Sequence, residues 1–274
     1  MGFDVKVLGQ LEFCVDGVPI APSAAKPRQL LAVLTLNAGR AMPVSLLVAE
    51  LWNQAPPQSA VGTLQTYIGK LRKSLKFALA DHSQDRADEV LVREPSGYRL
   101  VLPPGSIDTE VYEKHARIGR HAAETGDYPT AVASLDEALS LWRGDALADV
   151  SAGPLLLADI VKLEETRISD LDLRIGSALR LGRHHQLVGE LAGLCARYPA
   201  SETFCAKYML ALYRSGQQGR ALEVYHRLRT SMVSEFGIDP PVSIQRLHMA
   251  LLRGEPGIAD PYTDARLAAG SVAS

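Results

Sequence analysis

Apolar and polar residues alternate over the first twenty residues of the chain. Residues 3–20 read FDVKVLGQLEFCVDGVPI, in which apolar positions recur every second residue, with Gly9 and Asp16-Gly17 between the runs. A period of two is typical of strands with one buried face, and Asp-Gly pairs favour tight turns. The pattern predicts short antiparallel strands joined by tight turns.

Three segments follow in which apolar residues recur about every 3.6 positions, as in amphipathic helices. The first spans 24–38, carries Pro27 in its first turn, where a missing N–H costs little, and ends at Asn37-Ala38-Gly39. A shorter second helix is expected after Pro43, before the break at Ala55-Pro56-Pro57. The residues expected to point inward from this second helix are Leu46, Leu47 and Leu51.

The third helix is predicted from Ser59 to Phe77, with Ser59 as its N-cap. Its buried stripe is expected to consist of Val61, Leu64, Ile68, Leu71 and Leu75. At about 100° per residue, the opposite face carries Gly62, Thr66, Gly69, Lys70 and Lys73, with Thr63 and Lys76 beside it. A glycine in an exposed helix costs about 1 kcal/mol relative to alanine. Because stability does not call for Gly62 and Gly69, they favour close approach of another body, such as a phosphate backbone.

A hairpin is predicted after a polar loop at residues 81–88. Two apolar runs in VLVREPSGYRLVL flank Glu94-Pro95-Ser96-Gly97, with Arg93 and Arg99 beside the turn. Strands, three helices and a hairpin in this order predict an α+β winged helix-turn-helix domain. The last helix of such a domain can enter a DNA major groove, which is wide enough to admit it.

Charge is spread unevenly along a chain whose formal net charge is −2. Residues 1–105 carry eleven Lys or Arg against nine Asp or Glu, whereas the remaining residues carry a net charge of −4. The segment 63–80 has no acidic residue and holds the four cations Lys70, Arg72, Lys73 and Lys76. This cluster indicates an anionic partner for the first half, and a solvated helix face is the alternative that charge alone leaves open.

The second half of the chain repeats itself. Gly126, Gly182 and Gly216 are each followed at positions +5, +9 and +12 by residues suited to packing. The last two glycines are 34 residues apart, the tetratricopeptide period. The pattern predicts an all-α tetratricopeptide-like helical repeat domain, which is an interaction surface and not a catalyst. The expected helices are 109–125, 128–142, 155–181, 184–197, 202–215 and 218–235, with a short closing helix at 244–252.

Both halves resemble the Streptomyces antibiotic regulatory proteins (SARPs), a family of transcriptional activators. AAKPRQLLAVLTLNAGR, LVAELW, TLQTYIGKLRKSL and REPSGYRL look like the OmpR-type winged helix. LSLWRGDALADV, LRLGRHHQLVGEL and EFGIDPPVSIQRLHMALL resemble the bacterial transcriptional activation domain that follows it. The expected domains are a DNA-binding domain at 1–104, an activation domain at 107–253 and a disordered tail at 254–274.

The resemblance implies that the third helix enters the major groove, with Thr66 and Lys70 at base edges. The basic residues that follow would face phosphates, although helical phase puts Arg72 at the side of the helix. Either Arg93 or Arg99 would lie at the adjacent minor groove, and the GY after the wing turn would be a packing position. The predicted DNA-binding residues are Thr63, Thr66, Lys70, Arg72, Lys73, Lys76, Arg93 and Arg99.

The family also implies a function. Its members would bind double-stranded DNA at direct repeats near a −35 element, as a homodimer, and contact RNA polymerase through the housekeeping sigma factor. The genes controlled would be those of secondary-metabolite (antibiotic) biosynthesis. Unlike in ordinary response regulators, the winged helix comes first, and no receiver domain is expected before it.

Other chemistry is not expected. No GxxxxGK[ST] phosphate loop occurs and no motif frames a nucleophile, so neither an enzyme nor a cofactor is expected. The large SARPs append an ATPase module, and a piece of such a protein stays an open alternative. The histidines lack the partners of a metal site. Without an apolar run of about 20 residues or a secretion signal, the chain is expected in the cytosol, with the nucleoid.

The cysteines do not suggest a disulfide framework. The chain has three, Cys14, Cys195 and Cys205, and the last two lack the CxxC spacing of redox and metal motifs. Cys195 and Cys205 are therefore interpreted as small core residues.

Two further functions stay open on the sequence alone. One is a tetratricopeptide adaptor whose winged helix binds protein and does not read DNA specifically, so that its DNA binding is weak and independent of sequence. The other is a sensor with a small-molecule pocket between the domains. A ligand of such a sensor would raise the melting temperature and change the DNA affinity together.

Overall fold

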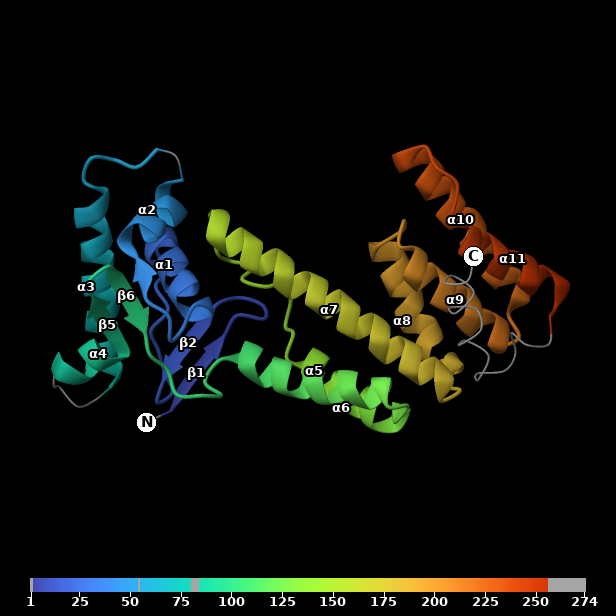
Figure 1. Cartoon of the computed structure of the whole chain (residues 1–274), viewed down its shortest axis with the longest axis horizontal. Coiled ribbons are helices and arrows are strands. Elements are labelled where there is room, and N and C mark those ends of the chain that lie inside the picture. Colours follow the sequence, from blue (N-terminus) through green and yellow to red (C-terminus); the bar gives the residue numbers. More distant parts are fainter. Residues whose placement is uncertain (1, 54, 80–83, 256–274) are drawn as a thin grey trace. The chain divides into compact units, whose positions relative to one another are not determined.

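The structure, a computed structural model, describes residues 2–53, 55–79 and 84–255 (Figure 1). The described chain forms two compact units. The first combines the chain up to Ala116 with Glu137–Ile168, and the second combines Arg117–Asp136 with the described chain from Ser169 on. The first unit therefore contains the winged helix together with part of the helical half. From residue 256 on, the expected tail lies outside the described residues.

The strands predicted near the N-terminus form a three-stranded antiparallel sheet. In sheet order they are β1 (Phe3–Lys6), β2 (Glu12–Val15) and β3 (Val18–Pro19). Asp16 and Gly17 turn the chain between β2 and β3 with φ angles of 46° and 81°, the left-handed region that Asp-Gly turns require. Val5 pairs in register with Phe13, and both are buried, which confirms the alternating pattern.

All three helices predicted for the first half are present. They are α1 (Ala25–Leu36), α2 (Val44–Trp52) and α3 (Ala60–Ala78). Pro27 lies in the first turn of α1, where its missing N–H breaks no helical hydrogen bond. Ser59 occupies the N-cap position of α3, but its side chain makes no capping hydrogen bond.

Two residues expected in the core are exposed, so those two predictions are wrong. Leu46 is 43% exposed because Leu47, the next residue of α2, occupies the inward face. Val61 is 49% exposed because Ala60 takes the inward position in the first turn of α3, four residues before Leu64. In each helix one expected core residue is exposed and its neighbour in the sequence is buried instead, while the other expected core residues are buried.

A second small sheet forms the wing. It consists of β4 (Met42–Pro43), β6 (Gly97–Leu100) and β5 (Leu91–Glu94), in that order. The loop expected at 81–88 is wrong over residues 84–88, where α4 (Gln84–Val90) forms. This short helix is stabilised because it buries Ala87 and Val90 in the core. Residues 81–83 lie outside the described residues.

Gly97 allows the wing to pack closely on β4. A Cβ atom at this position would lie 1.8 Å from the carbonyl oxygen of Met42. No side chain other than hydrogen fits at that distance, so the sheet requires glycine here. Tyr98, next along β6, is 3% exposed, which confirms the GY pair as a packing position.

Part of the helical half docks on the N-terminal sheet within the first unit. The Arg143 N–H donates to the Leu8 carbonyl at 2.8 Å, and the Leu147 N–H donates to the Val7 carbonyl at 3.0 Å. The Asp108 carboxylate in turn accepts from the N–H groups of Val7 and Leu8 at 2.9 and 3.0 Å. These hydrogen bonds join the loop after β1 to segments a hundred or more residues away.

The repeat pattern of the helical half is confirmed. Gly126, Gly182 and Gly216 each follow the first helix of a pair with φ angles of 81°, 73° and 75°, which favour glycine. Of the nine residues predicted to pack after them, seven are buried, and Leu194 and Tyr225 are half-buried. The helices are α5 (Asp108–Glu124), α6 (Tyr128–Ser140), α7 (Pro154–Arg180), α8 (His184–Arg197), α9 (Glu202–Arg214), α10 (Gln218–Phe236) and α11 (Val242–Arg253).

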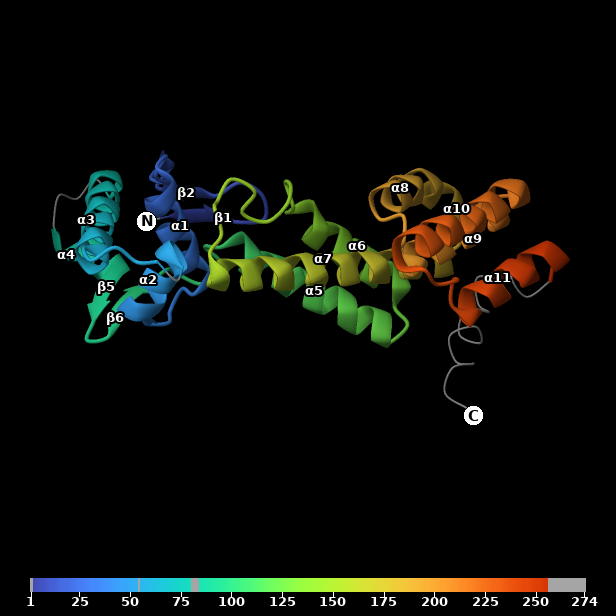
Figure 2. The same ribbon diagram turned by 90° about the horizontal axis from the view of Figure 1, so that it is seen from above.

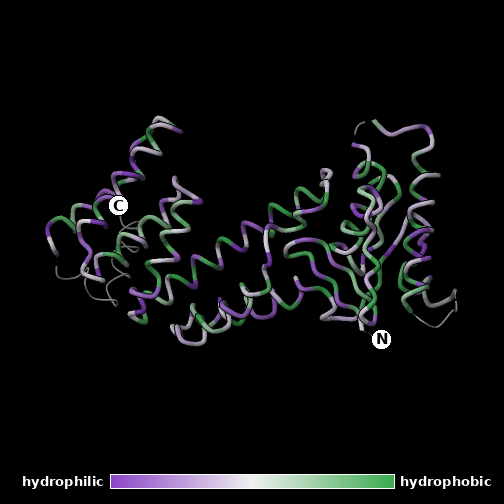
Figure 3. The backbone as a smooth tube through the Cα atoms, turned by 180° about the vertical axis from the view of Figure 1, so that it is seen from behind, coloured by the Kyte–Doolittle hydropathy of each residue, from purple (hydrophilic) through white to green (hydrophobic). Residues whose placement is uncertain are grey.

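Along the helices of both units, hydrophobic and hydrophilic residues are interspersed (Figure 3). Within the first unit, the strands β5 and β6 lie beside α3 in both views (Figure 2). Among the described residues, no helix has both the length and the apolar character needed to cross a membrane.

Candidate nucleic-acid interface

Helix α3 lies with one face on the core and the opposite face in solvent. Its inward side chains are at most 3% exposed, and they are Leu64, Ile68, Leu71 and Leu75. The ring of Trp52 from α2 stacks on Tyr67, with centroids 6.4 Å apart and planes at 17°. The core contacts set the rotation of α3 about its axis, so the polar face predicted from helical phase is the one that faces outward.

The predicted base-reading residues are on this outer face. Thr66, Lys70 and Lys73 are exposed, whereas Thr63 and Lys76 are partly buried beside them. The Thr66 hydroxyl donates to the Gly62 carbonyl oxygen at 3.0 Å, and its own oxygen can still accept a hydrogen bond.

Gly62 and Gly69 face open space. A Cβ atom at either position would meet no heavy atom within 4 Å. The packing of this protein therefore does not require glycine at these two exposed helix positions, in contrast to Gly97. The geometry thus agrees with the expectation that stability does not require Gly62 and Gly69.

Arg72 is engaged inside the domain. Its Nε and Nη2 atoms donate to the Leu91 carbonyl oxygen at 3.1 and 2.7 Å, and Nε lies 2.9 Å from Asp88 Oδ1. The guanidinium thus ties α3 to α4 and to the first residue of the wing. Arg72 lies at the side of the helix, as the helical phase indicates. A phosphate that bound its guanidinium would compete with the Leu91 carbonyl and the Asp88 carboxylate.

The two wing arginines differ in environment. Arg93 is exposed, one residue before the last of β5, and pairs in register with Tyr98. Arg99 is partly buried, and its Nη2 atom lies 2.7 Å from Oε1 of Glu94 across the hairpin. Because Arg99 already has a carboxylate partner, Arg93 is the wing arginine better placed to meet a phosphate.

One residue of this face was not among the predicted site residues. Gln65 is exposed on α3, about 40° around the helix from Gly69. Its amide carries both a donor and an acceptor, the combination that reads adenine edges. The helical phase that singled out Lys70 also puts Gln65 at the edge of this face, so the sequence carried the signal for it.

The electrostatics of the face follow from its composition. Along the whole of α3 there are four cations and no carboxylate. Lys70 and Lys73 stand on the exposed face itself, with Arg93 on the wing. A helix of this charge, braced by a hairpin, has the chemistry to neutralise phosphates while short polar side chains contact base edges.

Comparison with known proteins agrees with this geometry. Residues 107–252 match the family described as bacterial transcriptional activator domain, and residues 22–100 match the one described as transcriptional regulatory protein, C terminal. Regulatory protein DnrI of Streptomyces peucetius is 42% identical over 254 residues, which are 93% of each chain. The chain belongs to the SARP family of transcriptional regulators. This SARP is also 32% identical to transcriptional regulator RedD of Streptomyces coelicolor, over 94% of its own length and 73% of RedD.

Longer relatives extend beyond the matched region. Regulatory protein AfsR of Streptomyces coelicolor is 35% identical over 93% of this SARP, which spans only 24% of AfsR. The structure of Mycobacterium tuberculosis EmbR in complex with a low affinity phosphopeptide matches with a TM-score of 0.85 and 30% identity. That match covers 97% of this SARP and 69% of the EmbR chain.

Family membership confirms the winged-helix and helical-repeat fold class predicted from the sequence. It also confirms a transcriptional regulator with a DNA-binding domain, in a family of regulators and not of enzymes.

Proposed function

We propose that this SARP binds direct repeats near the −35 element of promoters for secondary-metabolite genes and activates them by recruiting RNA polymerase. The observation that carries the proposal is the exposed, carboxylate-free face of α3, with Lys70 and Lys73 on it, next to a wing that presents Arg93. The names of the relatives DnrI and RedD, both regulators, support the regulatory part.

In this proposal the residues on the exposed face of α3 have different roles. Thr66 and Lys70, with Gln65 beside them, read base edges in the major groove. Lys73 and Lys76 contact phosphates, which set position without carrying sequence information. Gly62 and Gly69 let the phosphate backbone approach the helix closely, which explains two glycines that the packing does not use.

The remaining predicted residues act at the borders of the helix. Thr63, in the first turn of α3, contacts a phosphate near the helix N-terminus, where the helix dipole favours an anion. Arg93 reaches the adjacent minor groove from the wing. Arg99 braces the hairpin through Glu94, and Arg72 positions α3 on the wing.

Direct repeats require two protomers that bind head to tail on one side of the DNA. The spacing of the half-sites is then about one helical turn of 10–11 base pairs or a multiple of it. The helical repeats pair the two protomers and contact the polymerase, through its housekeeping sigma factor, because such arrays present extended protein-binding surfaces. A protein that acts in this way is found with the nucleoid.

Fluorescence anisotropy tests the DNA-binding part. The probe is a promoter fragment from the neighbourhood of the gene, with a scrambled fragment as control, at two salt concentrations. We expect a preference for the promoter of about 10³ or more, and an affinity that falls steeply with salt. Equal, weak binding to both fragments would contradict specific recognition and favour the adaptor function.

Transcription in vitro tests recruitment separately. Purified RNA polymerase with its housekeeping sigma factor is assayed on the same promoter with and without this SARP. Moving one repeat by about 5 base pairs rotates it to the opposite side of the DNA and should abolish activation, whereas moving it by a full turn should restore much of it. Activation that is insensitive to the spacing would contradict paired binding to direct repeats.

A further inference from the structure

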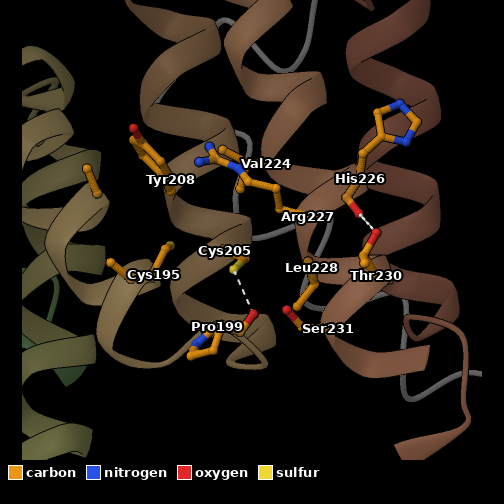
Figure 4. A pocket seen from close by; sticks show the side chains of 12 residues that line it. Cys195, Pro199, Cys205, Tyr208, Val224, His226, Arg227, Leu228, Thr230 and Ser231 are labelled. Carbon is orange, nitrogen blue, oxygen red and sulfur yellow. Dashed lines mark hydrogen bonds between the residues drawn. The ribbon is translucent and has the colours of Figure 1, made fainter. Parts of the chain in front are cut away.

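The second unit contains a cavity of about 520 Å³ that includes none of the predicted DNA-binding residues (Figure 4). Its lining comes from α8, α9 and α10. It includes the thiols of Cys195 and Cys205, together with the guanidinium-bearing residue Arg227. The volume is many times that of a water molecule or of hydrogen peroxide, so the cavity can admit a small oxidant.

The two cysteines come from neighbouring helices and face the same cavity. Cys195 lies on α8 and Cys205 on α9, and both residues line the cavity. The Cys205 Sγ atom also lies 4.0 Å from the Pro199 carbonyl oxygen (Figure 4). The third cysteine, Cys14, is part of β2 in the first unit.

The surroundings of the pair favour a thiolate at one of the two sulfurs. The neighbouring Cys195 thiol lowers the pKa of Cys205, burial raises it, and the positive charge of Arg227 lowers it. The interaction with Cys205, followed by burial, raises the pKa of Cys195. None of the described residues that line the cavity is a carboxylate, so the lining itself offers Arg227 no opposing charge.

We propose that Cys205 and Cys195 form a peroxide-reactive dithiol that closes to an intramolecular disulfide between α8 and α9. The site is a modification site whose reagent is a small hydroperoxide, and hydrogen peroxide is the simplest example. Cys205 is the residue that reacts with the peroxide, because it is the better thiolate, and Cys195 is the resolving residue.

The chemistry balances in two steps. The Cys205 thiolate attacks one peroxide oxygen, the O–O bond breaks, and the leaving oxygen takes a proton to become water, which leaves Cys205 as a sulfenic acid. The Cys195 sulfur then attacks the Cys205 sulfur, the S–OH bond breaks, and a second water leaves. Two thiols are oxidised by two electrons, and one hydrogen peroxide is reduced to two molecules of water.

The resulting bond would tie the second helix of one repeat to the first helix of the next. Thiols and disulfides interconvert with cellular thiol pools, so the bond is reversible. From the sequence, both cysteines are expected to be small core residues. Cys205 is buried, but Cys195 is only half-buried, and the cavity reaches both.

The test uses the full chain, fully reduced and then treated with hydrogen peroxide at increasing dose. Intact-mass measurement should show a loss of about 2 Da per chain, reversed by dithiothreitol. Peptide mapping without reductant should join the peptides of Cys195 and Cys205. The variant Cys14→Ser is the matched control and should react as the unchanged protein does. No loss of mass, or a bond that includes Cys14, would overturn the proposal.

Two further variants separate the roles of the cysteines. Cys195→Ser should stop at a sulfenic acid on Cys205, which dimedone traps, because no resolving thiol remains. Arg227→Met keeps the thiols and removes the charge, so oxidation should slow several-fold while far-ultraviolet circular dichroism stays unchanged. The absence of a dimedone label on Cys205 in Cys195→Ser, or an unchanged rate in folded Arg227→Met, would show that the roles assigned to the two cysteines are wrong.

Discussion

The Glu50 carboxylate of α2 accepts a hydrogen bond from the N–H of Gly153 at 2.8 Å, just before the first turn of α7. Its other oxygen accepts from the Leu155 N–H, also at 2.8 Å, and Glu50 is only 2% exposed. A carboxylate at a helix N-terminus satisfies donors that lack intrahelical partners and interacts favourably with the helix dipole. A Cβ atom at position 153 would lie 2.2 Å from the Glu50 carbonyl oxygen, so the contact also requires glycine. The helix-turn-helix and the start of α7 are thereby joined within the first unit.

Removing this carboxylate should destabilise the protein. In Glu50→Ala the part-buried N–H groups of Gly153 and Leu155 lose their acceptor, and we expect a loss of about 3 kcal/mol in the free energy of unfolding. Glu50→Gln should lose less, because the amide oxygen still accepts. Urea unfolding measures both. The exposed Glu223→Ala is the control and should change stability by at most about 0.5 kcal/mol. A Glu50→Ala value no larger than the control would contradict this role.

The two exposed glycines of α3 should lower the stability of the protein and strengthen its DNA binding. Gly62→Ala and Gly69→Ala should each raise the free energy of unfolding by up to about 1 kcal/mol, because alanine is the better helix former and the space is open. Both should weaken promoter binding, because the added methyl group keeps the phosphate backbone away. Gly189→Ala, in the exposed face of α8, is the matched control: it should stabilise without changing DNA affinity. An unchanged DNA affinity in the two α3 variants would contradict close approach of the phosphate backbone to α3.

Substitutions of base-reading residues and of phosphate-contacting residues should have different effects on DNA affinity in anisotropy measurements. Lys73→Ala should weaken binding to promoter and scrambled DNA alike, and should reduce the slope of log affinity against log salt by about one. Thr66→Ala and Lys70→Ala should lower promoter binding more than scrambled binding. If all three variants behave like Lys73→Ala, the assignment of Thr66 and Lys70 to base edges is wrong.

Arg72 should act mainly through the fold. Arg72→Met removes the hydrogen bonds to the Leu91 carbonyl and the ion pair with Asp88, and we expect a loss of about 1–2 kcal/mol in the free energy of unfolding. A residue that only contacted phosphate would leave stability unchanged and would lower the salt slope instead. Thermal unfolding without DNA and anisotropy at two salt concentrations therefore distinguish the two roles.

His248 should make stability depend on pH. Its ring stacks on Tyr225 with centroids 3.9 Å apart, and burial, followed by the charge of His226, lowers the pKa of His248. A pKa that is lower in the folded protein means that the fold prefers the neutral ring. The stability it contributes is complete above the unfolded pKa of about 6.5 and is lost as pH falls below that value. Urea unfolding between about pH 7.5 and 5.5 should therefore show a smaller loss in His248→Gln than in the unchanged protein. The exposed His121→Gln should keep the loss of the unchanged protein, and an equal loss in all three would contradict the prediction.

The sequence by itself determined most of the elements, although not α4 or β4, and the outer face of α3. Period-two alternation at 3–20, the 3.6-residue stripes and the three in-register glycines are local signals, because they reflect backbone geometry and one-sided burial. They place every predicted helix within a few residues, and they put Thr66, Lys70 and Lys73 on the outer face of α3.

Only the tertiary structure decided which partners those side chains have. In the sequence, nothing distinguishes Glu50 from other carboxylates on helices. In the structure its carboxylate accepts a hydrogen bond from the N–H of Gly153, about a hundred residues later. Arg72 and Lys73 are adjacent cations in the sequence, but only Arg72 meets the Leu91 carbonyl. Cys195 and Cys205 lack a redox motif and share a cavity because α8 and α9 pack together. Partners of this kind depend on how elements meet in space, and no local period of the sequence encodes that.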